Sequence, residues 1–255
     1  MSSNVPLRAI TFDLWDTIVA DDSDEAHRAA QGLLSKHDAR RASVYEILSH
    51  HGPTELGDVV EAYDSVEEAF RHAWHEEFIT WPVQDRLKEV LRRLKRTLPS
   101  AAFEEMVFTH ATMEVAVPPD LIDGAASVLS ELASEYSLAI VSDAIVSPGT
   151  SLRQLLSDHG VFKHFSAFAF SDEIGRSKPH PSMFRSVADQ LGVEGLSMVH
   201  IGDREKNDVV GAHDFGAKAV LFTATRSTDR EGTTADAVCE RYVDLPLIIK
   251  ALAGD

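Results

Sequence analysis

The chain has 255 residues, and its 24 lysine and arginine residues against 41 aspartate and glutamate residues give a formal net charge of −17. This length allows one large domain or one domain with a sizeable insertion, and the 44% share of hydrophobic residues argues against a disordered chain. The negative charge argues against nucleic-acid binding, which needs a concentrated basic surface.

A single cysteine, Cys239, excludes a disulfide framework and a thiolate metal cluster within one chain. The N-terminal residues lack the basic flank and apolar stretch of a signal peptide, and no apolar run is long enough to span a bilayer. We therefore expect a cytoplasmic protein that does not bind membranes.

The first half of the chain predicts one strand followed by a helical block. Residues 7–12 form an apolar strand pattern. Residues 21–117 contain no strand-like apolar run, and three prolines separate long charged amphipathic segments. The predicted helical segments are residues 25–51, 56–79, 84–98 and 101–115. We expect about four helices packed antiparallel through short connections.

In the second half of the chain, short apolar segments alternate with helical patterns. The predicted strands are residues 137–141, 167–170, 197–201 and 217–222, and the predicted helices are 124–136, 151–159, 181–191 and 206–215. Asp123 suits a helix N-cap, and Gly192 and Gly216 suit helix ends. Residues 237–252 are expected to add a strand and a short helix.

Strands that alternate with helices indicate a parallel sheet covered on both faces. The fold class predicted is therefore α/β, a Rossmann-like doubly wound parallel sheet. Residues 1–19 and 118–255 would form this core, and residues 20–117 would form an inserted all-helical domain.

In a doubly wound sheet the functional site lies beyond the carboxyl ends of the strands, where the strand order switches. The first predicted strand ends at Asp13, in the sequence Asp-Leu-Trp-Asp-Thr. A carboxylate at a strand end can act as a nucleophile or as a ligand of a hard cation. Taken alone, Asp13 is more typical of a turn-capping aspartate.

Ser142 and Lys178 could both bind an anion. Ser142 follows the predicted strand 137–141, where a hydroxyl and the N–H groups of a helix start can hold a phosphate oxygen. By itself, Ser142 is more typical of an ordinary N-cap. Lys178 lies in a loop that contains Pro179 and Pro181, just before a predicted helix. A stiff loop suits a fixed ammonium group that neutralises an anion.

Asp203 and Asp208 lie at the end of the predicted strand 197–201 and in the first turn of the next helix. Two carboxylates held close together repel each other unless they share a cation. A site with oxygen ligands alone suits Mg²⁺. The sequence therefore indicates a magnesium site at this edge of the sheet.

The four segments in this order resemble the haloacid dehalogenase (HAD) superfamily, most of whose members are phosphotransferases. The resemblance covers the whole chain, with the helical block as a C1-type cap. It implies that Asp13 is the nucleophile and becomes an aspartyl ester. The substrate-binding residues that it implies are Thr17, Ser142, Asp143 and Lys178. The Mg²⁺ ligands that it implies are Asp13, the backbone carbonyl of Trp15, Asp203 and Asp208.

Trp15 departs from the family pattern. Phosphatases of this family usually carry a second aspartate at this position, which protonates the leaving group and then activates water. An indole cannot transfer a proton, so another carboxylate would have to supply a role that is typically worth about 10²–10⁴-fold in rate. Asp16, where the family commonly has glycine, and Asp143, where it often has asparagine, are the candidates.

The favoured function is a Mg²⁺-dependent phosphatase that acts on a small phosphorylated metabolite through an aspartyl phosphate at Asp13. One alternative is a metal-free 2-haloacid dehalogenase, because family dehalogenases have an aromatic residue in place of the second aspartate. Against it, dehalogenases lose the Gly-Asp pair that Gly202 and Asp203 preserve here. A weakly active or inactive domain that binds a phosphorylated ligand is the third alternative. The sequence carries no signal for the oligomeric state.

Overall fold

A computed structural model describes residues 5–254, so residues 1–4 and 255 of the predicted core lie outside the described residues. The core is one sheet of six parallel strands in the order β3-β2-β1-β4-β5-β6. The strands are β1 (Ala9–Phe12), β2 (Ser137–Ser142), β3 (Phe165–Phe170), β4 (Met198–Gly202), β5 (Lys218–Phe222) and β6 (Ala237–Cys239). The predicted doubly wound parallel sheet is confirmed.

The central strand β1 brings the carboxyl ends of its neighbours to one edge of the sheet. Phe12, its last residue, pairs with Ile140 of β2 on one side and with Ile201 of β4 on the other. The strand order reverses between β1 and β4, so the residues that follow these strands meet at the switch point.

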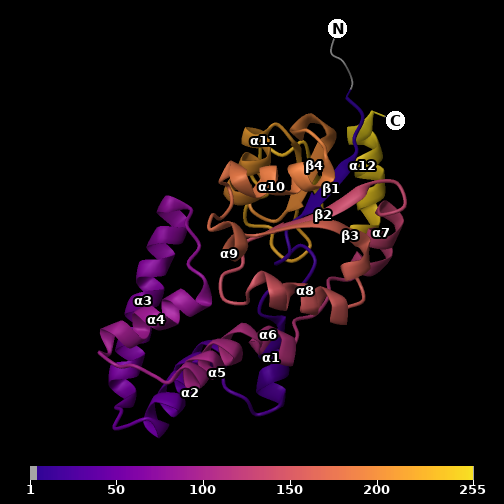
Figure 1. Ribbon diagram of the computed structural model, residues 1–255. Coiled ribbons are helices and arrows are strands. Elements are labelled where there is room, and N and C mark those ends of the chain that lie inside the picture. Colours follow the sequence, from indigo (N-terminus) through magenta and orange to yellow (C-terminus); the bar gives the residue numbers. More distant parts are fainter. Residues whose placement is uncertain (1–4, 255) are drawn as a thin grey trace.

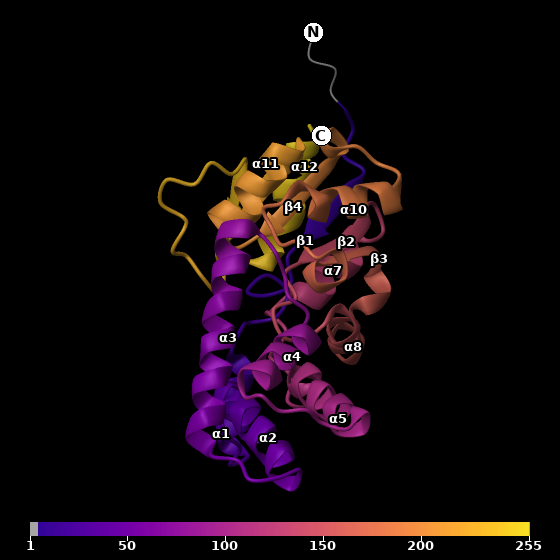
Figure 2. The same cartoon turned by 60° about the vertical axis from the view of Figure 1, so that its left-hand side comes forward.

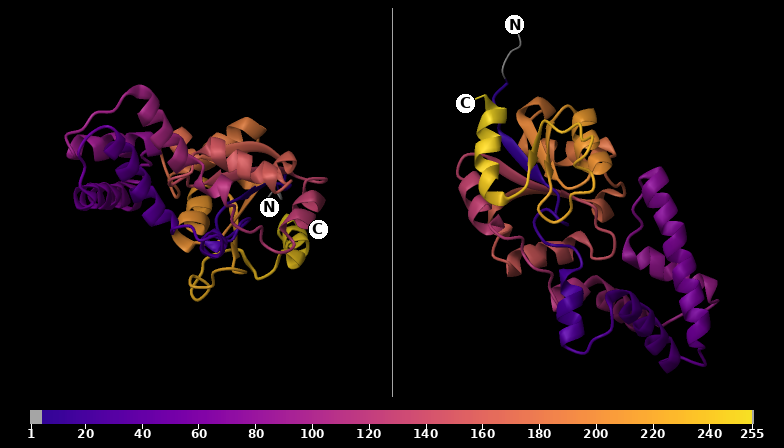
Figure 3. Two further views of the ribbon diagram at one scale, coloured as in Figure 1. Left: turned by 90° about the horizontal axis from the view of Figure 1, so that it is seen from below. Right: turned by 180° about the vertical axis from the view of Figure 1, so that it is seen from behind.

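Helices cover both faces of the sheet, because side chains that alternate along each strand point to opposite faces. Ile10 and Phe12 belong to one buried cluster, and Ala9 belongs to the other. The first cluster packs against α7 (Ala125–Leu132), α8 (Gly149–Asp158) and α12 (Leu245–Ala253). The second packs against α10 (Pro181–Leu191), the π-helical segment η3 (Glu205–Val210) and α11 (Gly211–Phe215). Figure 3 shows α12 beside α7 on the side of the sheet away from α10 and α11.

The chain between β1 and α7 forms a separate helical body (Figures 1 and 2). Its helices are α1 (Ser23–Ala30), α2 (Lys36–His50), α3 (Leu56–Glu77), α4 (Val83–Arg93), α5 (Ser100–Ala111) and α6 (Met113–Ala116). Buried apolar side chains of α2 to α5 form its own core, which includes Val44, Val66, Leu87 and Met106. None of the helices within residues 5–254 is both long and apolar enough to cross a membrane.

Several predicted boundaries are wrong. The helical block holds six helices rather than about four. Residues 25–51 are divided into α1 and α2, because Gly32 has a left-handed backbone (φ 71°) and the Ser35 side chain caps α2 by accepting from the Asp38 N–H. Gly124, with φ 81°, caps α7 in place of Asp123. The ends predicted at Gly192 and Gly216 are confirmed, and both residues have positive φ.

A buried hydrogen bond ties the segment after β1 to the C-terminal part of the core. The Tyr242 hydroxyl donates to the Thr17 carbonyl at 2.5 Å, and both residues are fully buried. Tyr242→Phe leaves that carbonyl without its donor, so we expect a loss of about 1–3 kcal/mol in the free energy of unfolding. Urea denaturation should show a lower midpoint at an unchanged slope. Tyr45→Phe, on half-buried Tyr45 of α2, is the matched control, and equal midpoints for the two variants would contradict the prediction.

Candidate active site

A cavity of about 290 Å³ lies between the carboxyl edge of the sheet and the helical body. From the core it is lined by Asp13, Trp15, Asp143, Ile145, Val146, Ser147, Lys178, Arg204, Asn207 and Asp208. From the helical insertion and the segment leading into it the lining residues are Asp21, Asp22, Lys36, Arg40, Trp74 and Glu114. Both bodies therefore contribute to one cavity.

The Lys178 ammonium group is buried among carboxylates at the floor of this cavity. Its Nζ lies 2.7 Å from Asp13 Oδ1 and 2.6 Å from Asp208 Oδ1. The backbone N–H of Lys178 donates to Asp143 Oδ1 at 2.9 Å. All four residues are at most 6% exposed. One cation thus links the acids that follow β1, β2 and β4.

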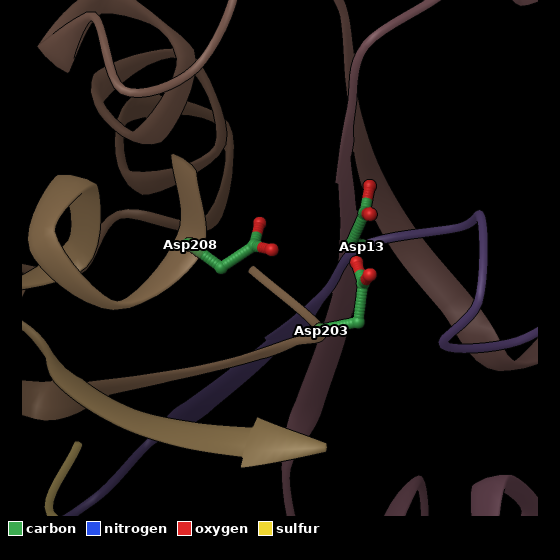
Figure 4. Close-up of side chains that lie close together, drawn as sticks. All are labelled: Asp13, Asp203 and Asp208. Carbon is green, nitrogen blue, oxygen red and sulfur yellow. The ribbon is translucent and has the colours of Figure 1, made fainter. Parts of the chain in front are cut away.

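Asp203 joins Asp13 and Asp208 in a cluster whose nearest carboxylate oxygens lie within 4.8 Å of one another (Figure 4). Both Asp203 oxygens are buried, and neither accepts a hydrogen bond from any described residue. Arg204 Nε and Arg226 Nη1 lie 3.7 and 3.6 Å from Oδ2, beyond hydrogen-bond distance. Buried carboxylate oxygens that lack a donor fit a hard divalent cation, whose preferred ligands are oxygens.

The pKa values follow from burial and from the distance to Lys178. Burial and the repulsion of Asp208 and Asp13 raise the pKa of Asp203 to about 8. Burial likewise raises the pKa of Asp143 to about 6, although Lys178 opposes the shift. Burial would also raise the pKa of Asp208, but Lys178 and His200 outweigh it and hold that pKa below its usual range. Asp203 is therefore the acid most in need of a further cation.

Sequence reasoning did not select Thr11 and His200, which lie behind the cluster. His200 Nε2 lies 3.1 Å from Asp208 Oδ1, and its Nδ1 lies 2.8 Å from Thr11 Oγ1. Because a carboxylate only accepts, Nε2 must carry a proton. Burial lowers the pKa of His200, and in the neutral ring Nδ1 accepts from the Thr11 hydroxyl. Both residues are fully buried and pair across β1 and β4. A polar side chain within an apolar strand was the signal that could have revealed them.

The structure does not bring every predicted site residue to the cavity. Trp15 lines it, but Asp16 does not. Asp16 lies in a turn with φ 54°, and its Oδ1 accepts from the Asp21 N–H at 3.2 Å. The Thr17 and Ser142 hydroxyls are buried without a hydrogen-bond partner among the described residues, and neither residue is among those that line the cavity.

The model of the haloacid dehalogenase-like hydrolase family matches residues 7–216. The chain belongs to this family. The match runs from β1 to the end of α11 and so includes the acids of the cluster and Lys178. The chain is therefore a member of a hydrolase family, with an α/β core and inserted helices.

Similar proteins include phosphatases and dehalogenases. The chain is 26% identical over 218 residues to phosphoglycolate phosphatase from Cereibacter sphaeroides, a match that covers 84% of each chain. It is 32% identical over 100 residues to glyceraldehyde 3-phosphate phosphatase from Methanopyrus kandleri, but this match spans 38% of the chain and only 43% of that relative.

Two solved structures share the fold over nearly the whole chain. The HAD phosphatase from Thermococcus onnurineus has a TM-score of 0.61 at 22% identity and covers 95% of this chain and 98% of its own. The 2-haloacid dehalogenase from Pseudomonas syringae pv. Tomato has a TM-score of 0.64 at 18% identity and covers 96% and 99%. At these identities the likeness shows the fold alone.

Gly202, the last residue of β4, gives Asp208 the space that it occupies. A Cβ at position 202 would lie 2.2 Å from Asp208 Cγ. Gly202→Ala should therefore displace Asp208 from Lys178 and lower the free energy of unfolding by about 1–3 kcal/mol, as overpacking does. Gly57→Ala is the control, because a Cβ at Gly57 of α3 meets nothing within 4 Å. Urea denaturation of both variants measures the effect, and equal stability would contradict the prediction.

Proposed function

We propose that this hydrolase is a Mg²⁺-dependent phosphatase that acts on a small phosphorylated metabolite through an aspartyl phosphate at Asp13. The carrying observation is the buried cluster of Asp13, Asp203 and Asp208 beside Lys178, in which both Asp203 oxygens lack a donor. The phosphatase relatives support this assignment over dehalogenation. So does the pair Gly202 and Asp203, which dehalogenases of the family lack.

Asp13, Asp203, Asp208 and the Trp15 carbonyl are the ligands that we propose for Mg²⁺. When bound, Mg²⁺ supplies positive charge that offsets the repulsion between the carboxylates and the phosphate. Among the described residues, Lys178 is the only lysine or arginine whose side chain lies within hydrogen-bond distance of these carboxylates, whereas those of Arg204 and Arg226 lie 3.7 and 3.6 Å from Asp203 Oδ2. Phosphate binding should therefore depend on the metal.

The proposed reaction has two displacements at phosphorus. An Asp13 oxygen attacks phosphorus, the bond to the leaving oxygen breaks, and that oxygen takes a proton from an acid. Water then attacks the aspartyl phosphate, gives its proton to the same residue, and releases phosphate as the bond to Asp13 breaks. Lys178 neutralises charge on the phosphoryl oxygens throughout, and the helical cap excludes bulk water.

Asp143 is the residue that we assign as the acid and base in place of Trp15. It lines the cavity, whereas Asp16 does not. Its Oδ2 lies 3.4 Å from both Trp74 Nε1 and Asn207 Nδ2, two groups whose residues also line the cavity. Burial raises the pKa of Asp143 to about 6, which suits proton transfer near neutral pH.

Phosphate release should require both Mg²⁺ and Asp13. We expect p-nitrophenyl phosphate or acetyl phosphate to be hydrolysed with Mg²⁺ and not with EDTA. Asp13→Asn should lower kcat by at least about 10³-fold, because it removes the nucleophile. Phosphate release is measured with these two compounds and halide release with 2-chloropropionate, each with Mg²⁺ and with EDTA. Halide release that persists in EDTA would replace the proposal with the dehalogenase.

A binding protein without turnover would give a different result. It would release neither phosphate nor halide from any compound, but it would bind Mg²⁺ in isothermal titration calorimetry. Asp203→Asn should abolish that binding in either case, since it removes the carboxylate whose oxygens accept no hydrogen bond from any described residue. Mg²⁺ binding without release of phosphate or halide would favour the weakly active or inactive domain that binds a phosphorylated ligand.

The pH–rate profile should reveal Asp143. An acid must be protonated to act, so kcat/KM for an alkyl phosphate should fall as the pH rises through about 6, the pKa of Asp143. Asp143→Asn should lose this limb and react about 10²–10⁴-fold more slowly. An aryl phosphate, whose leaving group needs no proton, should lose much less activity.

Asp16→Asn is the matched control for this experiment. It makes the same chemical change on a residue outside the cavity lining, so the limb near pH 6 should remain. Retention of the limb in Asp143→Asn, or its loss in Asp16→Asn, would refute the assignment.

A further inference from the structure

The cap side of the cavity carries two cations that are already paired. Lys36 and Arg40, both on α2, line the cavity together with Glu114 of α6. Arg40 Nη2 donates to Glu114 Oε1 at 2.7 Å, and Lys36 Nζ lies 3.8 Å from the same oxygen. The other Glu114 oxygen accepts from the Ser147 hydroxyl. Glu114 is only 5% exposed, so its charge acts at short range on both cations.

Further carboxylates complete the charge balance. Lys36 Nζ lies 2.8 Å from Asp24 Oδ1 and 3.1 Å from Asp22 Oδ1. Burial would lower the pKa of Lys36, but these acids raise it, so its ammonium stays charged. Two cations therefore face three carboxylates, Asp22, Asp24 and Glu114. Among the described residues, the lysine and arginine on the cap side of the cavity are therefore outnumbered by the acids that pair with them.

We propose that the substrate is a phosphomonoester whose leaving group bears hydroxyl or carbonyl oxygens but no second anionic group, and that Glu114 sets this preference. The proposal rests on the proposed phosphatase function. A carboxylate on the leaving group would meet acids that already outnumber the cations on the cap side, and it would lose its hydration without gaining an uncompensated cation there.

A neutral oxygen is recognised without this electrostatic cost. A guanidinium has five N–H donors, and Glu114 is hydrogen-bonded to only one of those of Arg40. The remaining donors suit a hydroxyl or carbonyl oxygen. Trp15, Trp74, Ile145 and Val146 supply apolar wall for a short carbon chain, and a cavity of about 290 Å³ suits a small molecule. The preference differs from the substrate named for the phosphoglycolate phosphatase relative.

Two matched pairs of esters test the substrate class in the wild-type protein with Mg²⁺. Ethylene glycol monophosphate and phosphoglycolate differ only in a hydroxymethyl group against a carboxylate, as do glycerol 3-phosphate and 3-phosphoglycerate. We expect kcat/KM to be at least about tenfold higher for the neutral member of each pair. This is the effect expected from one uncompensated charge near a protein surface. Equal rates, or faster hydrolysis of the carboxylates, would overturn the proposal.

Glu114→Gln tests the residue itself. It keeps the shape but frees the charges of Arg40 and Lys36, so the neutral-to-carboxylate ratio should fall at least about tenfold, mainly through a lower KM for the carboxylates. Asp64→Asn is the matched control, because Asp64 pairs with Arg41 and does not line this cavity. An unchanged ratio in Glu114→Gln, or an equal fall in Asp64→Asn, would overturn the role of Glu114.

Arg40→Met gives a second variant with the opposite sign. It leaves the acids less compensated, so kcat/KM for the carboxylate esters should fall, and a rise would contradict the proposal. Failure of the proposed function looks different from failure of this inference. Absence of Mg²⁺-dependent phosphate release from every ester contradicts the phosphatase, whereas release that favours the carboxylates contradicts only the substrate class.

Discussion

The carboxyl edge of the sheet depends on the ion pairs of the buried Lys178 ammonium group. Lys178 pairs with Asp13 and Asp208, and its backbone N–H holds Asp143. Carboxylates buried so close together would otherwise take up protons, because neither water nor a counter-ion would stabilise their charge. One cation is enough for Asp208 but not for the whole cluster. Asp203, with a pKa of about 8, is left with a charge deficit that a divalent cation would meet.

The sheet and the helical cap contribute different groups to the site. Because β1 pairs with β2 and β4 in register, the acids that we propose to act on phosphorus follow neighbouring strands, and Lys178 reaches them from the loop before α10. The cap contributes Trp74, whose indole reaches Asp143, and the paired cations Lys36 and Arg40. Charge is thus unbalanced toward the negative at the core end, where a metal would bind, and nearly compensated at the cap end, where a leaving group would lie.

Much of the fold could be predicted from the sequence, because strand periodicity and helix signals are local. The parallel sheet, its six strands and the inserted helices followed from apolar patterns and from residues such as Gly192 and Gly216. Boundaries inside the helical block were harder to place. The break between α1 and α2 depends on a backbone conformation at Gly32 and on a side-chain cap at Ser35, neither of which changes the amphipathic pattern.

The sequence by itself determined that Asp13 and Asp203 follow strand ends, that Asp208 lies in the first turn of a helix and that Lys178 lies in a loop just before a helix. Parallel strands bring the positions that follow their carboxyl ends to one edge. Only the tertiary structure decided which other polar side chains contact the residues at that edge and which point away from it. His200 reaches Asp208 through the sheet, Asp16 turns away from the cavity, and Glu114 meets cations more than seventy positions earlier in the chain. Such contacts depend on how distant elements pack, and no local pattern encodes them.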